Sequence, residues 1–240
     1  MSHPVLAQLA RSEPAERADA CRRAARDPAA VLLVDALAGA LGDPVPAVAQ
    51  AASDALAELG AQSDATRAAL RRALHGERAN ARWAAAFALF RLSPPDSGLL
   101  PPLVEAWTCS AGDVRWRAAR LLVQCEALLP EVRPLVRGLA AGDPRPEVRR
   151  MAIHCVGKID PDDREMRRTL LLAAGDAVPA ARRAAVAALA ALPAAEPEVY
   201  ERLRAIAASD PDPGCRRLAA RALAAFESET GLPRTRGSAA

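Results

Sequence analysis

The residues of this chain that are best suited to chemistry are a few aromatic and basic side chains. Trp83, Phe87 and Trp116 belong to a set of only seven aromatic residues, namely three Trp, three Phe and one Tyr. The basic residues that follow them in related positions are Arg120, Arg150, His154, Arg183, Arg217 and Arg221. Trp and Arg are common anchors of protein interfaces, and the same residue types stack on bases and neutralise phosphates. The chemistry that suits this set is recognition of a partner.

Residues that could support catalysis or hold a metal lack the required spacing. The three histidines, His3, His75 and His154, form no HxxxH or HExxH motif. The sequence contains no glycine-rich phosphate loop and no GxSxG elbow. An acidic cluster at 162–165 is typical of favourable charge at the start of a helix. We therefore expect no enzymatic activity, no cofactor and no metal site.

The composition is that of a folded chain with little net charge. Of the 240 residues, 51% are hydrophobic and 25% are charged, and the mean hydropathy is +0.00. These values exclude an intrinsically disordered chain. The excess of basic over acidic residues is only +3, so no nucleic-acid partner is expected unless the positive charge is clustered.

The cysteines and the apolar segments bear on the compartment. The five cysteines are odd in number, widely spaced and without a CxxC motif, which argues against a disulfide framework or a zinc site. Residues 1–20 contain no apolar segment typical of a signal peptide. The longest apolar runs, at 31–41 and 184–195, are too short to span a bilayer. We expect a cytoplasmic protein that does not enter a membrane.

An internal repeat determines the expected fold. One pattern of apolar residues at i, i+4, i+7, i+8 and i+11 occurs six times, and the residue at i+4 is Ala in every copy. The first residues of the copies are Val48, Ala81, Val114, Val148, Ala181 and Cys215, so successive copies lie 33 or 34 residues apart. This spacing is the buried stripe of an amphipathic helix, and the shared Ala marks a point of close approach between helices.

A second apolar helix is expected before each copy, with a turn between the two helices. The expected first helices are 31–41, 66–74, 99–107, 132–140, 166–174 and 199–207. The turns often contain Asp and Pro, as at Asp176 and Pro179, and both residue types suit the start of a helix. The unit is therefore a helical hairpin of about 33 residues. The expected fold class is all-α, a right-handed α-α superhelix, or solenoid, of about six to seven such hairpins.

The hairpins divide the chain from end to end. The six repeats are expected at about 29–61, 62–95, 96–128, 129–161, 162–194 and 195–227. Residues 1–28 are expected to form a degenerate N-terminal capping hairpin, because Arg22 and Arg23 stand near positions where the pattern has apolar residues and solenoid ends need a polar cap. Residues 228–240 hold Gly, Pro, Ser and Thr without a period and are expected to be a flexible tail.

The repeat resembles the HEAT repeat family, in particular the short bacterial HEAT-like repeats also called PBS-lyase-type, within the armadillo-like superfamily. The second helix of that family follows roughly the pattern D-x4-V-R-x2-A-x2-A-L-x2-L, and residues 142–152, GDPRPEVRRMA, are similar to its first part. The resemblance covers about residues 30–227. It is specific for the fold and says little about function, because such solenoids have many roles.

The resemblance also implies a ladder of ion pairs between repeats. In the family, the Arg after the first position of a copy commonly joins the turn Asp of a neighbouring repeat. The residues concerned here are Arg149, Arg182 and Arg216 with Asp143, Asp176 and Asp210. The repeats that contain Arg82 and Arg115 lack the turn Asp, which leaves the role of these two arginines open.

The resemblance further implies which side of the repeats meets a partner, because second helices of the family line the concave wall. The residues opposite the buried stripe stand at i+2, i+6 and i+9. The i+2 row is Gln50, Trp83, Trp116, Arg150, Arg183 and Arg217, and the i+6 row is Asp54, Phe87, Arg120, His154, Ala187 and Arg221. We expect an exposed aromatic patch followed by a basic surface, because contiguous apolar patches mark contact sites. The alternative is that the aromatic residues fill gaps between repeats.

Three classes of function are compatible with this surface. The favoured one is a non-enzymatic scaffold or adaptor for a protein or peptide partner that carries an apolar anchor and acidic groups. The second is nucleic-acid binding on the same face, as in the HEAT-like alkylpurine DNA glycosylases, although Arg120 stands where a carboxylate would be needed. The third is a bilin lyase-like role, which only the resemblance to PBS-lyase-type repeats implies.

Overall fold

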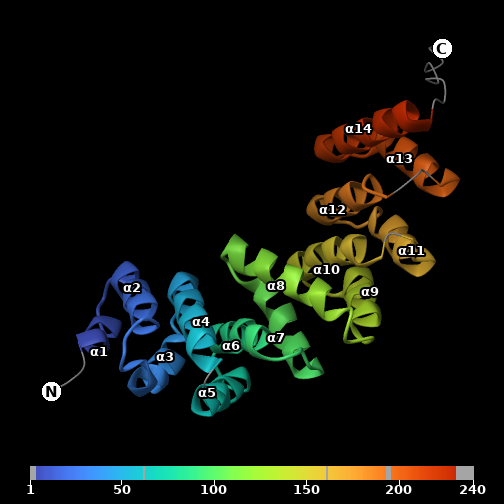
Figure 1. The fold of residues 1–240 in the computed structure, drawn as a ribbon. Helices are drawn as coiled ribbons and strands as arrows, with labels where there is room; N and C mark the ends of the chain where they lie inside the picture. The colour runs from blue at the N-terminus through green and yellow to red at the C-terminus, as the bar shows by residue number, and fades with distance from the viewer. Residues whose placement is uncertain (1–3, 62, 161, 193–195, 231–240) are drawn as a thin grey trace, which may run out of the picture. The chain divides into compact units, whose positions relative to one another are not determined.

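The structure is a computed structural model that describes residues 4–61, 63–160, 162–192 and 196–230 (Figure 1). These residues contain fourteen α-helices, three 3-10 helices and no strand. The chain forms two compact units, unit 1 (Met1–Val132) and unit 2 (Arg133–Ala240). None of the described helices is long and apolar enough to cross a membrane.

Unit 1 consists of four helical hairpins. Its helices are α1 (Pro4–Leu9), α2 (Pro14–Ala24), α3 (Val34–Ala40), α4 (Pro46–Gly60), α5 (Asp64–Leu74), α6 (Ala79–Leu92), α7 (Leu100–Glu105) and α8 (Gly112–Cys125). Each odd-numbered helix packs against the even-numbered helix that follows it, and α2, α4, α6 and α8 pack against one another in chain order. The 3-10 helices Ala30–Leu33, Ser97–Leu99 and Ala106–Thr108 adjoin α3 and α7.

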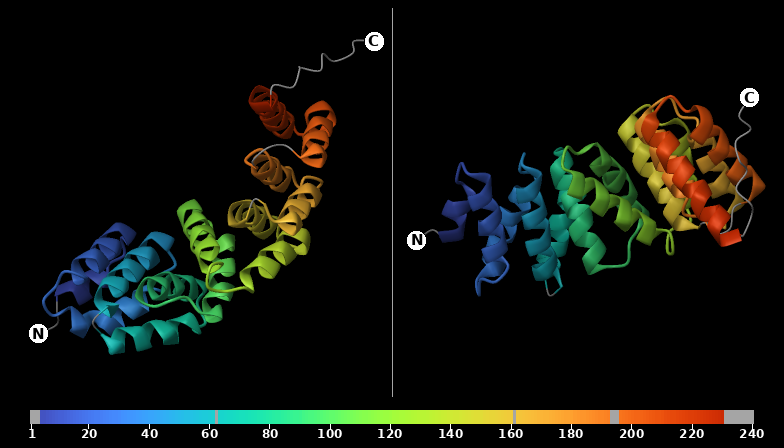
Figure 2. Two further views of the ribbon diagram at one scale, coloured as in Figure 1. Left: turned by 45° about the vertical axis from the view of Figure 1, so that its right-hand side comes forward. Right: turned by 90° about the horizontal axis from the view of Figure 1, so that it is seen from above.

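Unit 2 continues the same arrangement. Its helices are α9 (Val132–Gly142), α10 (Pro146–Ile159), α11 (Arg164–Ala173), α12 (Pro179–Leu189), α13 (Pro197–Ser209) and α14 (Pro213–Thr230). The second helices α10, α12 and α14 pack side by side, drawn from yellow to red in Figures 1 and 2. The expected all-α solenoid of HEAT-like helical hairpins is confirmed.

The local sequence explains where the second helices begin and how closely they pack. Pro46, Pro146, Pro179 and Pro213 are the first residues of α4, α10, α12 and α14, and proline is preset for the first helical turn, where its missing N–H costs nothing. The shared alanines at i+4 are all fully buried, and these residues are Ala52, Ala85, Ala118, Ala152, Ala185 and Ala219. A larger side chain at these points would push neighbouring helices apart.

Three segments differ from the sequence-based expectation. The helix expected at 31–41 is the 3-10 helix Ala30–Leu33 followed by α3. The helix expected at 99–107 is a short α-helix, Leu100–Glu105, flanked by 3-10 turns. At the C-terminal end, α14 extends to Thr230 and so enters the predicted tail 228–240. The rest of that predicted tail lies outside the described residues.

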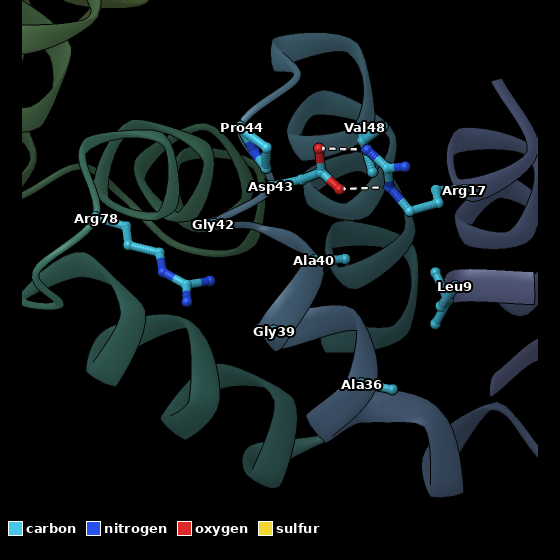
Figure 3. A pocket seen from close by; sticks show the side chains of 10 residues that line it. All are labelled: Leu9, Arg17, Ala36, Gly39, Ala40, Gly42, Asp43, Pro44, Val48 and Arg78. Carbon is cyan, nitrogen blue, oxygen red and sulfur yellow. Dashed lines mark hydrogen bonds and ion pairs between the residues drawn. The ribbon is translucent and has the colours of Figure 1, made fainter. Parts of the chain in front are cut away.

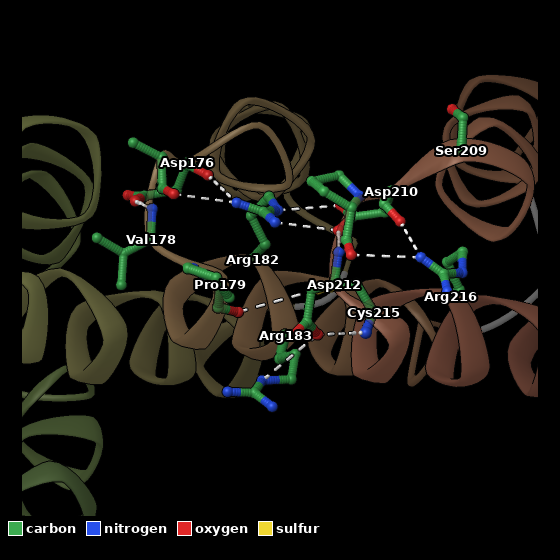
Figure 4. A network of polar contacts seen from close by, with 12 residues as sticks. Asp176, Val178, Pro179, Arg182, Arg183, Ser209, Asp210, Asp212, Cys215 and Arg216 are labelled. Atoms are coloured by element: carbon green, nitrogen blue, oxygen red, sulfur yellow. Dashed lines mark hydrogen bonds and ion pairs between the residues drawn. The ribbon is translucent and has the colours of Figure 1, made fainter.

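Ion pairs between repeats connect the hairpins of unit 2 (Figure 4). Arg149 donates through Nε and Nη2 to the carboxylate of Asp176 at 2.7 and 3.0 Å. Arg182 donates in the same way to Asp210, both distances being 3.0 Å. Each guanidinium also donates through Nη1 to a carbonyl of its own turn, that of Asp143 for Arg149 and that of Asp176 for Arg182, both at 2.8 Å. One Arg therefore joins its own turn to the turn of the next repeat, and the ladder expected at Arg149 and Arg182 is confirmed.

The turn aspartates serve the backbone as well as the ladder. Each accepts a hydrogen bond from the backbone N–H two residues later, which is an Asx turn. The residues are Asp43, Asp143, Asp176 and Asp210, with distances of 2.8 to 2.9 Å. The carboxylate of Asp143 pairs with Arg145 and not with a ladder arginine as expected. Arg216 donates to the carbonyl of Asp210 at 2.6 Å.

Unit 1 contains two pairs of the same kind that the sequence pattern did not assign. Arg17 of α2 donates to both carboxylate oxygens of Asp43 at 2.7 and 3.0 Å, and the pair lines a cavity of 270 Å³ (Figure 3). Arg82 of α6 pairs with Glu105 of α7, with Nε at 2.8 Å. The role of Arg82, open from the sequence, is thus a ladder contact in which Glu105 replaces the turn Asp. Arg115 donates to the carbonyls of Cys109 and Ser110.

The first prediction concerns the stability that the ladder provides. Arg182 and Asp210 are both buried, so replacing Arg182 with Ala leaves a buried carboxylate without its cation and should lower the free energy of unfolding by about 3 kcal/mol. The neighbouring Arg183 is exposed, and Arg183→Ala should change it by less than about 0.5 kcal/mol. Urea denaturation of both variants checks this. Equal losses would contradict it.

The second prediction concerns acid. Hydrogen bonds from Arg149 and Arg182 lower the pKa of Asp176 and Asp210 below the ordinary value of 3.8. Their contribution to stability is therefore complete above pH 3.8 and is lost as the pH falls through their lower folded pKa values. The double variant Asp176→Asn, Asp210→Asn should be less stable than the wild type at pH 7, and the two should converge in acid. Parallel stability curves from pH 7 downward would refute this.

Candidate partner-binding surface

The expected aromatic patch is wrong at two of its residues. Trp83 is 1% exposed and Phe87 is 0% exposed, so neither can meet a partner on an open face. The cause lies in α6, whose residues 83–90 form an uninterrupted apolar run, WAAAFALF. A helix that is apolar all round is buried all round, and α6 packs against α4, α5, α7 and α8. The alternative reading, in which these rings fill gaps between repeats, is the correct one.

Side chains of α4 and α8 meet over this buried pair. Gln50 Nε2 donates to Asp113 Oδ2 at 2.7 Å, and Arg117 Nη2 donates to Asp54 Oδ1 at 2.9 Å. The Arg117 guanidinium carbon lies 4.8 Å from the centre of the Phe87 ring, a cation–π distance. Both hydrogen bonds join residues 63 positions apart, so they bridge two repeats and cover the one between them.

The two buried rings also have partners of their own. The Trp83 and Phe87 ring centroids lie 5.2 Å apart at an interplanar angle of 48°, a tilted arrangement typical of aromatic pairs. The indole Nε1 of Trp83 donates to Asn80 Oδ1 at 3.1 Å, which satisfies the single polar atom of that ring. Both residues therefore belong to the core of unit 1.

Trp116 and Arg120 are exposed, as the sequence predicted, but they lie on α8 in unit 1. Trp116 is 49% exposed. The other five predicted residues lie in unit 2. The two sets therefore belong to different compact units of the chain. The aromatic part of the expected site is reduced to Trp116.

The predicted basic residues of unit 2 do come together. We define the basic surface as Arg150, His154, Arg183, Arg217 and Arg221. Arg183, Arg217 and Arg221 are exposed, whereas Arg150 and His154 are half-buried. They lie on α10, α12 and α14, which pack side by side in that order.

The two arginines of each consecutive pair on these helices make different contacts. In the pairs Arg149–Arg150 and Arg182–Arg183, the first residue donates to the aspartate ladder and the second lies on the basic surface. Successive residues of a helix point about 100° apart, so one cannot replace the other. The first arginine of each pair therefore joins two repeats, and the second lies on the basic surface.

The exposed alanines and the scarcity of acids complete the character of the basic surface. Ala187, Ala220 and Ala224 are exposed between the basic side chains. The sequence of α12 holds no acidic residue, that of α14 holds none before Glu227, and α10 carries one, the exposed Glu147. The surface is therefore cationic. It is also flat at the alanines, because their side chains end at Cβ.

Two further groups set the charge of this surface. Burial lowers the pKa of His154, and the neighbouring Lys158 and Arg150 lower it further, so the imidazole is neutral at pH 7. Lys158 is exposed on α10; the rows of the repeat pattern missed it, because it lies one position beyond i+9. Asp212 is the acidic neighbour, with Oδ1 3.9 Å from Arg183 Nε and also accepting the N–H of Cys215 at 2.8 Å.

The basic row is also unusually placed along the helices. Arg150, Arg183 and Arg217 each follow the first proline of their helix by four residues, close to the helix N-terminus. The helix dipole is positive at that end and favours anions. A cation at this position therefore gains no stability from the helix dipole.

Other kinds of site find no support in the described part of the chain. It holds no group of three or more His, Cys, Asp or Glu side chains that could bind a metal ion. Cys21, Cys125, Cys155 and Cys215 are buried free thiols. Burial raises the pKa of Cys21 and Cys125 to about 11, which leaves these two thiols protonated and unreactive at neutral pH.

Comparison with known families agrees with the geometry. Residues 100–167 match the family model described as HEAT repeats. This segment of the chain contains HEAT repeats. The resemblance predicted from the sequence is thereby confirmed. No curated protein matches the chain in sequence.

Solved structures agree at the level of the fold. An archaeal HEAT-like repeats protein from Thermococcus onnurineus is 15% identical, with a TM-score of 0.51 over 93% of this chain and 96% of its own. The complex of CpcE and CpcF of phycocyanin lyase from Nostoc is 21% identical, with a TM-score of 0.40 over 80% of this chain and 98% of that one. A designed armadillo repeat protein in complex with the peptide (KR)4 is 18% identical, with a TM-score of 0.38 over 92% and 98%. The last two scores are too low to support a conclusion about this HEAT-repeat chain.

The third prediction concerns the three tryptophans. Trp116 is 49% exposed, whereas Trp83 and Trp107 are 1% and 0% exposed. Trp116→Phe should therefore remove most of the fluorescence that acrylamide quenches, and Trp83→Phe should leave it in place. Stern–Volmer titration of the two variants measures this. Strong quenching that persists without Trp116 would show that the buried pair is open to solvent.

Proposed function

We propose that this HEAT-repeat chain is a non-enzymatic adaptor that binds a protein partner through acidic groups on that partner. The binding site is the basic surface of unit 2. One observation carries the proposal: the second arginine of each consecutive pair is presented at the same helical position on α10, α12 and α14, while the first is held in the structure of the repeat. A merely solvated surface would need no such repetition.

Charge and residue type support a protein partner. Guanidinium groups bind carboxylates in a bidentate geometry and are frequent interface anchors. Rows of like charge raise the association rate and orient the incoming partner. The apolar anchor expected from the sequence is no longer part of this surface, because Trp83 and Phe87 are buried in unit 1. Acidic groups on the partner therefore carry the recognition.

Nucleic-acid binding is the alternative that the same observation allows, because phosphates also bind guanidinium groups. The net charge of only +3 and the absence of an aromatic stacking residue from the basic surface favour the protein partner. A bilin lyase-like role receives no support from the described residues.

The fourth prediction tests the proposal by charge reversal. The triple variant Arg150→Glu, Arg183→Glu, Arg217→Glu should lose a protein that the wild type captures from nuclease-treated extract of the producing cells, identified by mass spectrometry. The matched control reverses three exposed arginines on the first helices of the same unit, Arg164, Arg168 and Arg204. It should retain the captured protein, because its net charge is the same and only the position differs. Circular dichroism should show equal helicity for both variants.

Two outcomes would overturn the proposal. Loss of capture in both triple variants would show that overall charge, and not the basic surface, controls binding. Binding of single-stranded oligonucleotides that depends on the same three arginines and weakens steeply with salt would show that the basic surface binds nucleic acid.

A further inference from the structure

We propose that the basic surface recognises an extended acidic segment in the polyproline II conformation, with a carboxylate at every third residue, that crosses α10, α12 and α14. This inference rests on the proposed function and specifies its partner. It follows from the spacing of the arginines, the relief of the surface and the acidic neighbour Asp212.

The spacing is set by helix packing. Arg150, Arg183 and Arg217 stand at the same position on three helices that pack side by side. Axes of packed helices lie about 8–10 Å apart. The guanidinium groups are therefore attached at intervals of about 8–10 Å along a line that crosses the helices.

A polyproline II backbone presents side chains on one face at that interval. A polyproline II helix rises about 3.1 Å per residue with three residues per turn, so every third side chain recurs at about 9.3 Å on the same face. A β-strand rises about 3.3 Å and repeats on one face at about 6.6 or about 13 Å. An α-helix repeats at about 5.4 Å per turn, and at about 10.5 Å after seven residues. The first of these lies within the range of about 8–10 Å expected for the arginine row, and the seven-residue spacing of an α-helix lies just above that range.

The relief of the surface admits such a chain. Ala187 on α12 and Ala220 and Ala224 on α14 are exposed near the arginines, so at these points a backbone can lie close to the helices. A polyproline II chain has no internal hydrogen bonds and keeps its backbone groups in water. It can therefore lie over a low alanine surface without leaving polar groups unpaired. Contact then comes from the carboxylates, one to each arginine.

The acidic neighbour of the row acts as an internal competitor. Asp212 lies 3.9 Å from the middle arginine, Arg183, and a ligand carboxylate must compete with it. Asn at this position would remove the charge while still accepting the N–H of Cys215, because Asn is also a good helix cap. Asp212→Asn should therefore strengthen binding without loss of the α14 N-terminus.

The experiment compares two labelled peptides of the same composition by fluorescence anisotropy at low salt. One consists of four Glu-Pro-Pro triplets; the other has the same four glutamates in a row followed by the prolines. The triplet peptide should bind about tenfold more tightly, because it alone reaches all three arginines. Arg183→Glu should remove this difference, and Asp212→Asn should tighten the binding of the triplet peptide several-fold.

The outcomes separate this inference from the proposed function. Equal affinity for both peptides, lost in the Arg150, Arg183 and Arg217 triple variant, overturns the three-residue spacing and leaves the acidic-partner adaptor standing. Peptide binding that the triple variant retains overturns both. If a single-stranded oligonucleotide binds more tightly than the triplet peptide and depends on the same arginines, the ligand is nucleic acid and the proposal of an acidic segment is wrong.

Discussion

The bidentate ion pair between one repeat's arginine and the next repeat's aspartate is the constraint on which the rest of unit 2 depends. In a solenoid each repeat contacts mainly its neighbours, so register must be fixed again at every junction. Arg182 does this by donating to Asp210 of the following turn and to the carbonyl of Asp176 in its own. Planar guanidinium geometry makes the contact directional as well as attractive, which apolar packing of alanine-rich helices does not provide.

The same register creates the candidate surface. Once Arg149 and Arg182 are fixed between turns, the residues that follow them, Arg150 and Arg183, face away from the junction at a constant position. A structural repeat thus generates a regular row of charge. Unit 1 uses its charges differently, since Asp54 and Arg117 meet over the buried Phe87. Charged side chains of the second helices pair with one another in unit 1, whereas in unit 2 Arg183 and Arg217 are exposed to solvent.

Periodicity was sufficient to predict the fold, and much of the ladder followed from the resemblance. The position of Ala152 carries its own signal, because the equivalent residue is a fully buried Ala in every copy. Arg149 and Asp176 lie in neighbouring repeats, and their pairing is repeated by Arg182 and Asp210. Burial of Trp83 and Phe87 was not predicted, since a single apolar stripe was read on a helix that is apolar on all sides; the run 83–90 was the signal available. The ladder contacts of Arg17 and Glu105 were not predicted. Arg17 lies in the degenerate N-terminal repeat, and Glu105 lies on a first helix, where the repeat pattern assigns no acidic residue.

The central claim is that the first arginine of each pair holds the repeats together through its aspartate. A double-mutant cycle on Arg182 and Asp210, with each replaced by Ala alone and together, measures this most directly through the free energy of unfolding. The account predicts a coupling energy of about 2 kcal/mol between the two residues. A coupling energy near zero would contradict it, because the two side chains would then stabilise the chain independently of each other.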